Sequence, residues 1–383
     1  MISTLSKILI ASLAILSLSC KHHSETQEYQ SLAELRKLYA SGDPTIWPNP
    51  NLDSSVVEGF EDIGHLPDVQ HPVTNPYSKE KADLGKKLFF DPRLSLSGQI
   101  ACASCHNPEL AWTDNITRSF GHDRQNGKRN AMTIMNAAFA HELFWDGRAK
   151  SLEDQARFPI ADQVEMNEKL NIAVDKIDAV EGYKPLFENA FGTTEVSLER
   201  IQKAIATFER TVISHTSKFD RFIDNRPDLF TDQEVLGLHL FRTKARCINC
   251  HNTGYFSDNQ YHNDGQVLFG TKDEDFGRFI VTGDTADIGK FRTPTLREVA
   301  RTGPWMHHGH FPSLRDVVEF YNLGNPQVVQ KKYRGTPRDS LIPKVSPILQ
   351  KLNLSREEMD ALEAFMRTLS SGDTRMRAPE LPK

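Results

Sequence analysis

Two copies of one short cysteine and histidine pattern constrain this 383-residue chain more than any other feature. The first copy reads CASCH at residues 102–106, and the second reads CINCH at residues 247–251. In each copy two residues separate the cysteines, and a histidine follows the second cysteine directly. The fifth cysteine of the chain, Cys20, lies near the N-terminus. The two copies therefore predict two similar sites whose chemistry depends on what the thiols bind.

Three kinds of site compete for these thiols. If each pair formed a disulfide, the bond would close a tiny loop, stabilise little and leave the histidines without a role. If all four thiolates bound one zinc ion, the histidines would again be surplus, and the pairs are farther apart than in zinc ribbons. A c-type haem uses every residue, because the thiols add to its vinyl groups and the histidine binds its iron.

The haem interpretation predicts two covalently attached haem c groups. Chance is a weak explanation for two copies of the pattern in a chain with 5 cysteines and 14 histidines. The expected attachment residues are Cys102, Cys105, Cys247 and Cys250, and the expected proximal iron ligands are His106 and His251.

Residues 1–19 are typical of an export signal. Lys7 precedes an apolar run over residues 8–18, which is too short for an ordinary membrane span. Cys20 follows a small residue and precedes a polar stretch, as in bacterial lipoproteins, so we expect Cys20 to be lipidated. Ordinary signal cleavage and a retained anchor helix are the alternatives. Export predicts a periplasmic protein, in contact with the membrane through its lipid anchor only.

The remaining sequence predicts a mainly α-helical protein with two cytochrome c-like haem domains, long loops and little β-structure. Residues 20–76 are rich in Pro, Asn and Asp and are expected to form a mostly irregular N-terminal arm. The N-terminal haem domain is predicted at 77–228 and the C-terminal haem domain at 229–383. The formal charge of −5 gives no basic surface and thus argues against a nucleic-acid partner.

Three patterns predict helices in these domains. An apolar stripe with helical spacing is formed by Ile201, Ile205, Phe208 and Val212. Thr231 with Glu234, and Ser355 with Glu358, have the spacing of capping boxes at helix starts. The patterns place one amphipathic helix before the domain boundary and two helices after it.

Four blocks of the chain resemble the bacterial dihaem cytochrome c peroxidases and their relative MauG, which oxidises residues of a partner protein. The blocks are LGKKLFFDPRLSLSGQIACASCHNPELAWTD, NAMTIMNAAFAHELFWDGRAKSLEDQARFPIADQVEMN, GLHLFRTKARCINCHNTGYFSD and FRTPTLREVARTGPWMHHGHFPSLRDVVEFY. The resemblance covers roughly residues 77–370. It implies that the His106 haem reacts with hydrogen peroxide and the His251 haem transfers electrons. Because the family is often dimeric, it also implies a homodimer.

The resemblance assigns four roles around the first haem. Trp145 falls where the family places a tryptophan that relays electrons between the haems, and Glu165 falls at the acid–base carboxylate. Pro159 falls beside the vacant iron face. His122 lies in a loop whose histidine caps the peroxidatic iron in many resting peroxidases. The alternatives are a core tryptophan, a solvated glutamate, a loop proline and a solvated histidine.

The resemblance also implies a calcium ion between the haems. Asn130 and the backbone carbonyls of Thr293 and Thr295 fall at its ligand positions. Oxygen ligands of this kind suit a hard cation. One bound Ca²⁺ is therefore expected beside the two haem groups.

The second axial ligand of the His251 haem separates the branches of the family. Ordinary peroxidases have a methionine where this chain has Tyr321, and Met306 lies elsewhere in the block. A phenolate favours ferric iron and lowers the potential, which is the MauG-like pattern; the alternative is a packed helix tyrosine. MauG also has a tryptophan just before its second motif, where this chain has Ala245, so maturation of methylamine dehydrogenase is not expected.

The sequence thus favours an exported dihaem peroxidase of the tyrosine-ligated, MauG-like branch. Its electrons would come from a small cytochrome c, a cupredoxin or another oxidised substrate, including a protein side chain. A peroxidase that must first be half-reduced, a non-enzymatic dihaem electron carrier and a zinc-binding structural module are the alternatives.

Overall fold

The computed structural model describes residues 31–327, 329–372 and 376–383. The predicted export signal and Cys20 lie outside the described residues. Within the described ranges, no helix is long and apolar enough to cross a membrane.

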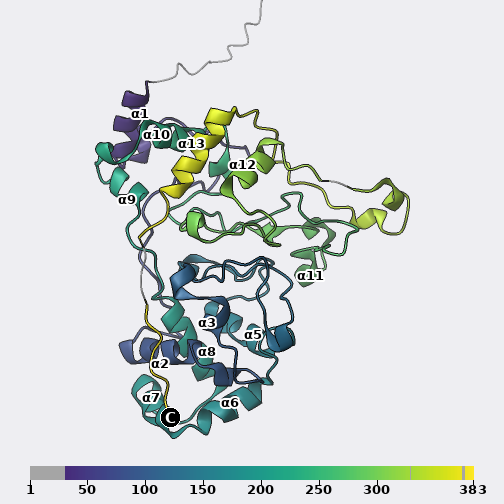
Figure 1. Cartoon of the computed structure of the whole chain (residues 1–383). Coiled ribbons are helices and arrows are strands. Elements are labelled where there is room, and N and C mark those ends of the chain that lie inside the picture. Colours follow the sequence, from purple (N-terminus) through teal and green to yellow (C-terminus); the bar gives the residue numbers. More distant parts are fainter. Residues whose placement is uncertain (1–30, 328, 373–375) are drawn as a thin grey trace, which may run out of the picture.

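The described chain forms two mainly helical bodies, one above the other in Figure 1, with long loops between them. The lower body contains α2 (Lys79–Phe89), α3 (Cys102–Cys105), α4 (Leu152–Gln155), α5 (Arg157–Ala161), α6 (Leu170–Asp178), α7 (Lys184–Phe191) and α8 (Leu198–Glu209). The upper body contains α1 (Leu32–Ala40), α9 (Lys218–Ile223), α10 (Asp232–Arg242), α11 (Phe279–Thr282), α12 (Leu314–Asn322) and α13 (Arg356–Arg367). Two short antiparallel strands, β1 (Tyr261–His262) and β2 (Phe291–Arg292), complete it, with Tyr261 opposite Arg292. The prediction of a mainly α fold with little β-structure is confirmed.

The predicted helix starts are correct in atomic detail. Thr231 and Glu234 form a reciprocal capping box on α10, and Ser355 and Glu358 form another on α13. Each box satisfies backbone N–H groups that lack partners in the first turn of a helix. Ile201, Ile205 and Phe208 of the predicted stripe are buried on α8, and Val212 is buried just beyond the end of this helix. The N-cap residue Ser197 accepts a hydrogen bond from the Arg200 amide.

One helix pair forms the centre of each body. In the lower body α2 crosses α8 at Gly85, where a Cβ atom would lie 1.8 Å from the carbonyl oxygen of Ala204. In the upper body α10 crosses α13 at Gly237, where a Cβ atom would lie 2.0 Å from the carbonyl oxygen of Ala361. Both helix pairs therefore need glycine at the crossing point.

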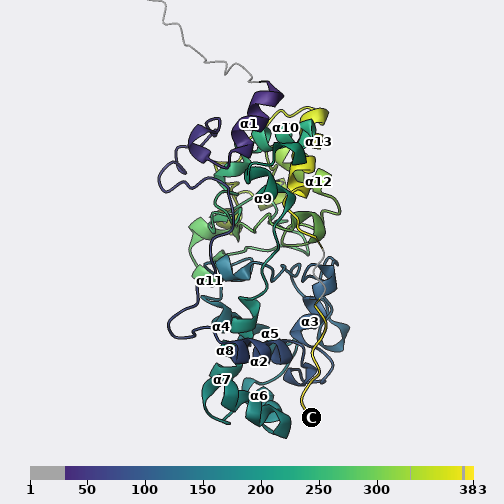
Figure 2. The same cartoon turned by 90° about the vertical axis from the view of Figure 1, so that its left-hand side faces the viewer.

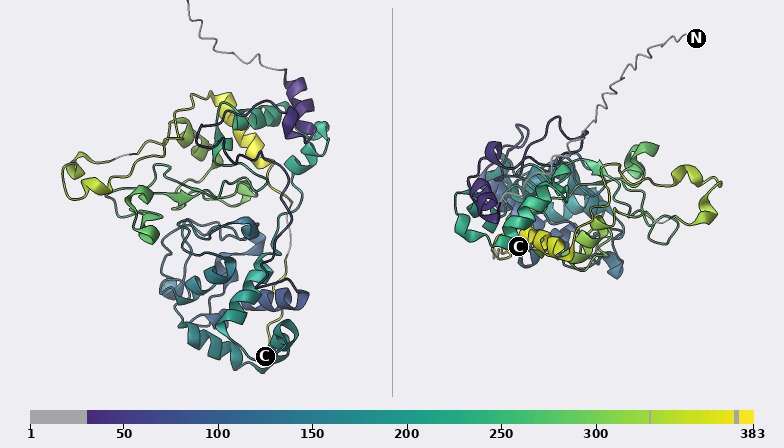
Figure 3. Two further views of the ribbon diagram at one scale, coloured as in Figure 1. Left: turned by 180° about the vertical axis from the view of Figure 1, so that it is seen from behind. Right: turned by 90° about the horizontal axis from the view of Figure 1, so that it is seen from above.

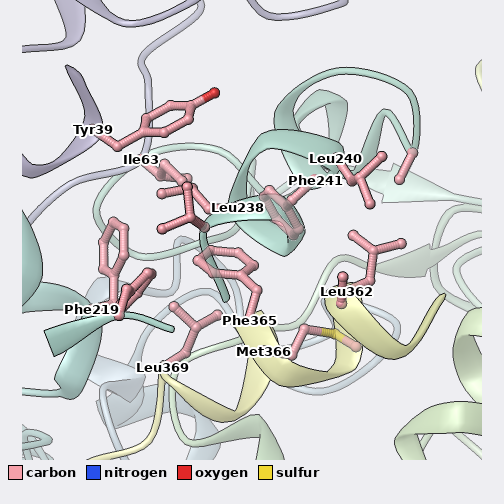
Figure 4. Close-up of a cluster of buried hydrophobic side chains, with 14 of the residues drawn as sticks. Tyr39, Ile63, Phe219, Leu238, Leu240, Phe241, Leu362, Phe365, Met366 and Leu369 are labelled. Atoms are coloured by element: carbon pink, nitrogen blue, oxygen red, sulfur yellow. The ribbon is translucent and has the colours of Figure 1, made fainter. Parts of the chain in front are cut away.

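The N-terminal arm contributes more structure than its composition suggested. Residues 32–40 form α1, which packs on α10, and the side chains of Tyr39, Trp47 and Ile63 join the core of the upper body. Figure 4 shows Tyr39 and Ile63 beside side chains of α10 and α13. The apolar face of α1 is short, so its burial depends on a partner that is distant in sequence.

The C-terminal tail returns from the upper body to the lower one. It passes α2 in Figure 1 and ends at the foot of the lower body, as Figures 1 and 2 show. The Gly182 amide donates a hydrogen bond to the Lys383 carbonyl, and Lys87 donates to the Glu380 carbonyl. The N-terminal arm and the C-terminal tail thus both run from the upper body to the lower one. Helix α1 lies at the far end of the upper body (Figure 3).

Candidate functional site

The first CASCH motif is a single helical turn, α3, whose last residue is followed by His106. The His106 amide donates to the Cys102 carbonyl at 3.0 Å. Nδ1 of His106 lies 3.2 Å from the Trp112 carbonyl oxygen, so Nδ1 carries the proton and donates it. This hydrogen bond fixes the ring and leaves Nε2 as the free metal-binding nitrogen.

The second motif repeats this geometry. The His251 amide donates to the Cys247 carbonyl at 2.9 Å. Nδ1 of His251 lies 3.1 Å from the Phe256 carbonyl oxygen. Both histidines are therefore held in the tautomer that binds iron through Nε2.

The thiols fit covalent haem attachment rather than zinc binding. All four are free, and burial raises the pKa of Cys105 to about 11 and that of Cys247 to about 12. Structural zinc sites gather four cysteine or histidine ligands around one ion. Across residues 31–327, 329–372 and 376–383, the side chains close enough together to bind one metal ion are Cys250, Asp258 and His262. This group contains one cysteine, whereas the zinc alternative needs all four. The residues present thus suit two haem c groups.

Both motifs open into one cavity of about 780 Å³ that runs between the two bodies. Its lining includes all four cysteines, both proximal histidines and Tyr321. The cavity also brings together Trp145, Pro159 and Glu165, three residues predicted to act at the first haem. Residues widely separated in the sequence therefore share one site.

Trp145 lies where the two bodies meet. Its Nε1 donates to the Asn130 carbonyl at 3.0 Å, and its own carbonyl accepts from the Arg292 amide at 2.7 Å. Its ring meets His307 edge-on, with the ring centroids 6.4 Å apart. These contacts hold the indole in one orientation, and its role between two haems stays a prediction.

Glu165 is the carboxyl group beside the first motif. Burial raises its pKa, Asp162 adds to this effect, and the guanidinium of Arg148 opposes it. Glu165, Asp162 and Arg148 also line a second, outer pocket of about 240 Å³. The carboxyl therefore lies in the wall between the haem cavity and a smaller pocket that also contains Arg157 and Phe158.

His122 lies close to Glu165, and its Nδ1 is buried without a hydrogen-bond partner. Its backbone amide donates to the Glu165 carbonyl at 2.7 Å, whereas Nε2 lies 3.4 Å from a carboxylate oxygen of Asp123. Gly121, not His122, is among the residues that line the cavity. The capping role of His122 stays a prediction.

The residues predicted to bind calcium all line the cavity. The Asn130 side chain uses its Nδ2 to donate to the Ile116 carbonyl at 2.9 Å. The Thr293 carbonyl accepts from the hydroxyl of Ser257 at 2.7 Å and lies 3.4 Å from the Arg292 guanidinium. This guanidinium would have to move for the carbonyl to bind a cation, so calcium stays a prediction.

Tyr321 lies on α12 and lines the part of the cavity that serves the second motif. Burial raises the pKa of its phenol well above the ordinary value, and the nearby Asp264 carboxyl adds to this effect. Burial in turn raises the pKa of Asp264 to about 6. Without a cation nearby the phenol keeps its proton, so a phenolate ligand would depend on the charge of ferric iron.

His307 and Glu209 are among the buried cavity residues that were not predicted from the sequence. His307 stacks on Phe291 with ring centroids 3.6 Å apart, and its Nε2 has no hydrogen-bond partner. Glu209, the last residue of α8, is 3% exposed, and its Oε2 has no partner. A repeat in the sequence could have drawn attention to Glu209, because AIATFERT at 204–211 parallels ALEAFMRT at 361–368.

Comparisons with known proteins agree with this geometry. The family described as di-haem cytochrome c peroxidase matches residues 79–228. The methylamine utilization protein MauG of Methylorubrum extorquens is 39% identical over 315 residues, which cover 82% of this chain and 85% of that protein. The cytochrome c551 peroxidase of Nitrosomonas europaea is 36% identical over 311 residues, which cover 81% of this chain and 86% of that enzyme.

Solved structures share the fold. A MauG-like protein associated with microbial copper homeostasis has a TM-score of 0.71 and 32% identity, and the match covers 80% of this chain and 93% of that chain. The diheme peroxidase BthA from Burkholderia thailandensis has a TM-score of 0.67 and 24% identity, and the match covers 86% of this chain and 99% of that chain. The second likeness supports the fold alone.

Proposed function

Because the chain belongs to the family of dihaem cytochrome c peroxidases and MauG and is an oxidoreductase, we propose that it reduces hydrogen peroxide at the His106 haem. The observation that carries this proposal is the position of Glu165. Its carboxyl lines the cavity beside the first motif and also borders an outer pocket. A small neutral molecule such as peroxide needs both an opening and a proton carrier at this place.

The bound haem supplies the redox chemistry that splits peroxide, with iron held by His106. Glu165 takes a proton from one peroxide oxygen and returns it to the other as the O–O bond breaks. Burial supports this role, because it raises the pKa of the carboxyl toward the working pH. Pro159 borders the same space and restricts what approaches Glu165.

Electrons travel between the two haem sites through Trp145. The indole is held between the bodies by hydrogen bonds at both its ring nitrogen and its backbone carbonyl. With the haem bound, His251 and Tyr321 would hold its iron, and a phenolate ligand would favour the oxidised form of the second haem. The external electron donor is a small cytochrome c, a cupredoxin or a protein side chain that is oxidised in the reaction.

A second candidate, oxidation of a protein partner, is favoured by Tyr321. A tyrosine ligand makes the second haem a poor electron store, which suits a site that holds oxidising equivalents. Ala245 stands beside the second motif where MauG has a tryptophan, so the partner would be another protein. We place either reaction in the periplasm, with the protein anchored through a lipid on Cys20.

The first test adds one equivalent of hydrogen peroxide to the fully oxidised protein and follows its visible, near-infrared and EPR spectra. We expect rapid loss of a high-spin ferric signal without prior reduction. A reaction that begins only after one electron is added would instead support capping of the iron by His122. No reaction in either state would contradict the peroxidase proposal and leave an electron carrier.

A further inference from the structure

Glu209 is a buried carboxyl group that neither the proposed peroxide reaction nor the packing of the core explains. It ends α8, lines the haem cavity and is 3% exposed. Its Oε2 is shielded from water and has no hydrogen-bond partner. A buried carboxyl oxygen without a partner is costly, so its retention needs a cause.

The upper body shows which residue can stand at the corresponding position of its own helix pair. Glu209 of α8 corresponds to Met366 of α13 in the parallel segments AIATFERT and ALEAFMRT. Both residues line the cavity. Since methionine fills this position in the repeat without any polar group, the fold does not require a carboxyl there.

Glu209 lies close to the first haem attachment site, and no neighbouring positive charge fully compensates its carboxylate. Cys102 on α3 lies within range of its charge. Arg210 could compensate that charge, but its guanidinium forms a 2.7 Å ion pair with Glu153 on α4. The charged and titratable groups around Glu209 are thus Arg210, Glu153 and the thiol that the haem converts to a thioether.

We propose that Glu209 is a proton-exchanging group of the first haem site, which binds a proton when the His106 haem gains an electron and releases it when the haem is oxidised. The proposal concerns this residue's coupling to the family's haem and does not depend on the peroxide reaction. In the reductive direction, a small cytochrome c or a cupredoxin would supply one electron to the haem, and the Glu209 carboxylate gains one proton from the solvent. No other bond forms or breaks.

The physical basis is the charge of the haem. Burial raises the pKa of Glu209 to about 8, with Arg210 opposing and Glu153 adding to the shift. One more positive charge on the haem lowers this pKa, and its removal raises it. In the pH range around the pKa, oxidation therefore expels a proton, and the ionised carboxyl stabilises the oxidised haem.

The experiment is a spectroelectrochemical titration of the His106 haem across neutral and alkaline pH. In the wild type, we expect the potential to fall as pH rises through the region near the Glu209 pKa. One proton per electron corresponds to a tenfold change in the redox equilibrium for each pH unit, or about 59 mV. E209Q should lose this segment while keeping any slope that arises from the haem propionates.

Two further variants test whether the effect belongs to this position. E209M copies the residue of the second repeat and should behave like E209Q. E199Q removes an exposed carboxyl from the same helix, where Glu199 pairs with Lys203, and should keep the wild-type slope. An identical pH slope in E209Q and the wild type would overturn the proposal.

Infrared difference spectroscopy gives a second readout, which follows the carboxyl group itself. Near the Glu209 pKa, reduction of the wild type should produce the C=O band of a protonated carboxyl group, and E209Q should lack this band. A redox difference spectrum without such a band would overturn the proposal. If the haem shows this coupling but never reacts with peroxide, only the peroxidase proposal fails.

Discussion

The lower and upper bodies are built on the same helical frame but differ in what they place beside the haem. Leu84-Gly85-Lys-Lys-Leu-Phe89 on α2 parallels Leu236-Gly237-Leu-His-Leu-Phe241 on α10, and a CXXCH motif follows each. Phe89 packs against Phe208 with ring centroids 5.4 Å apart, and Phe241 packs against Phe365 at 5.2 Å. The crossing glycines and aromatic pairs are thus shared requirements of a haem-holding frame.

The differences lie where the frame faces the cavity. The carboxyl groups of the lower body there include Glu165 and Glu209. The upper body places Tyr321 there beside the carboxyl of Asp264, and it has Met366 where the lower body has Glu209. We infer that a few side chains facing the cavity, and not the shared frame, distinguish the two haem sites.

The largest effect is expected when the proposed acid–base group of the lower body, Glu165, is removed. In E165Q we expect the reaction with peroxide to slow by about 10²–10⁴-fold, because an amide cannot take up and return the proton. Stopped-flow mixing of the oxidised protein with peroxide measures this rate. E109Q, which changes an exposed glutamate of the same body, is the control. A wild-type rate in E165Q would show that another group moves the proton.

The second change makes the upper body resemble an ordinary electron-transfer site. In Y321M we expect the potential of the second haem to rise by ~0.2 V, since axial ligands set haem potentials over roughly 0.8 V. Redox titration followed by near-infrared spectroscopy measures the shift and identifies the ligand. An unchanged potential and spectrum would show that Tyr321 is a packed helix residue and not a ligand.

The third prediction tests whether the two frames tolerate change equally. G85A and G237A each force a methyl group onto a backbone carbonyl, at 1.8 Å in the first and 2.0 Å in the second. We expect each to lower the free energy of unfolding by about 1–3 kcal/mol, because the helices must move apart. Denaturant titration of the haem-loaded variants measures the loss.

G335A provides the control for adding a methyl group, because nothing lies within 4 Å of the Cβ position at Gly335. Its positive φ of 72° adds local backbone strain, which does not involve helix packing. A loss in G85A or G237A no greater than that in G335A would contradict the requirement for close crossing.

The sequence predicted the frame well because each of its signals is local. Each signal is carried by residues that are close in the sequence. This holds for the CXXCH motifs, the capping boxes of α10 and α13, and the buried stripe of α8. The arrangement of the cavity was harder to predict. Trp145, Glu165 and Tyr321 were expected from a family resemblance, and the structure brings them to one cavity without testing their roles. Glu209 was missed because an isolated glutamate near a helix end resembles a solvated one.

The packing of the chain ends was also beyond local reasoning. The composition of the N-terminal arm suggested irregular structure, yet Tyr39 is fully buried and its hydroxyl lies 2.9 Å from Nδ1 of His239. This contact joins residues that are 200 positions apart. No short pattern reports such a partner, because the stability of a short helix comes mainly from tertiary packing.

Removing one helix cap from each frame should have the smallest effect on stability. S197A removes the side chain that accepts the Arg200 amide at α8, and T231A removes half of a capping box at α10. Each should cost about 1 kcal/mol, because a backbone N–H loses its partner. Hydrogen exchange resolves where each loss occurs. We expect S197A to weaken amides of the lower body and T231A those of the upper body. If either variant weakened both bodies equally, the two frames would unfold as one unit, joined by the arm and the C-terminal tail.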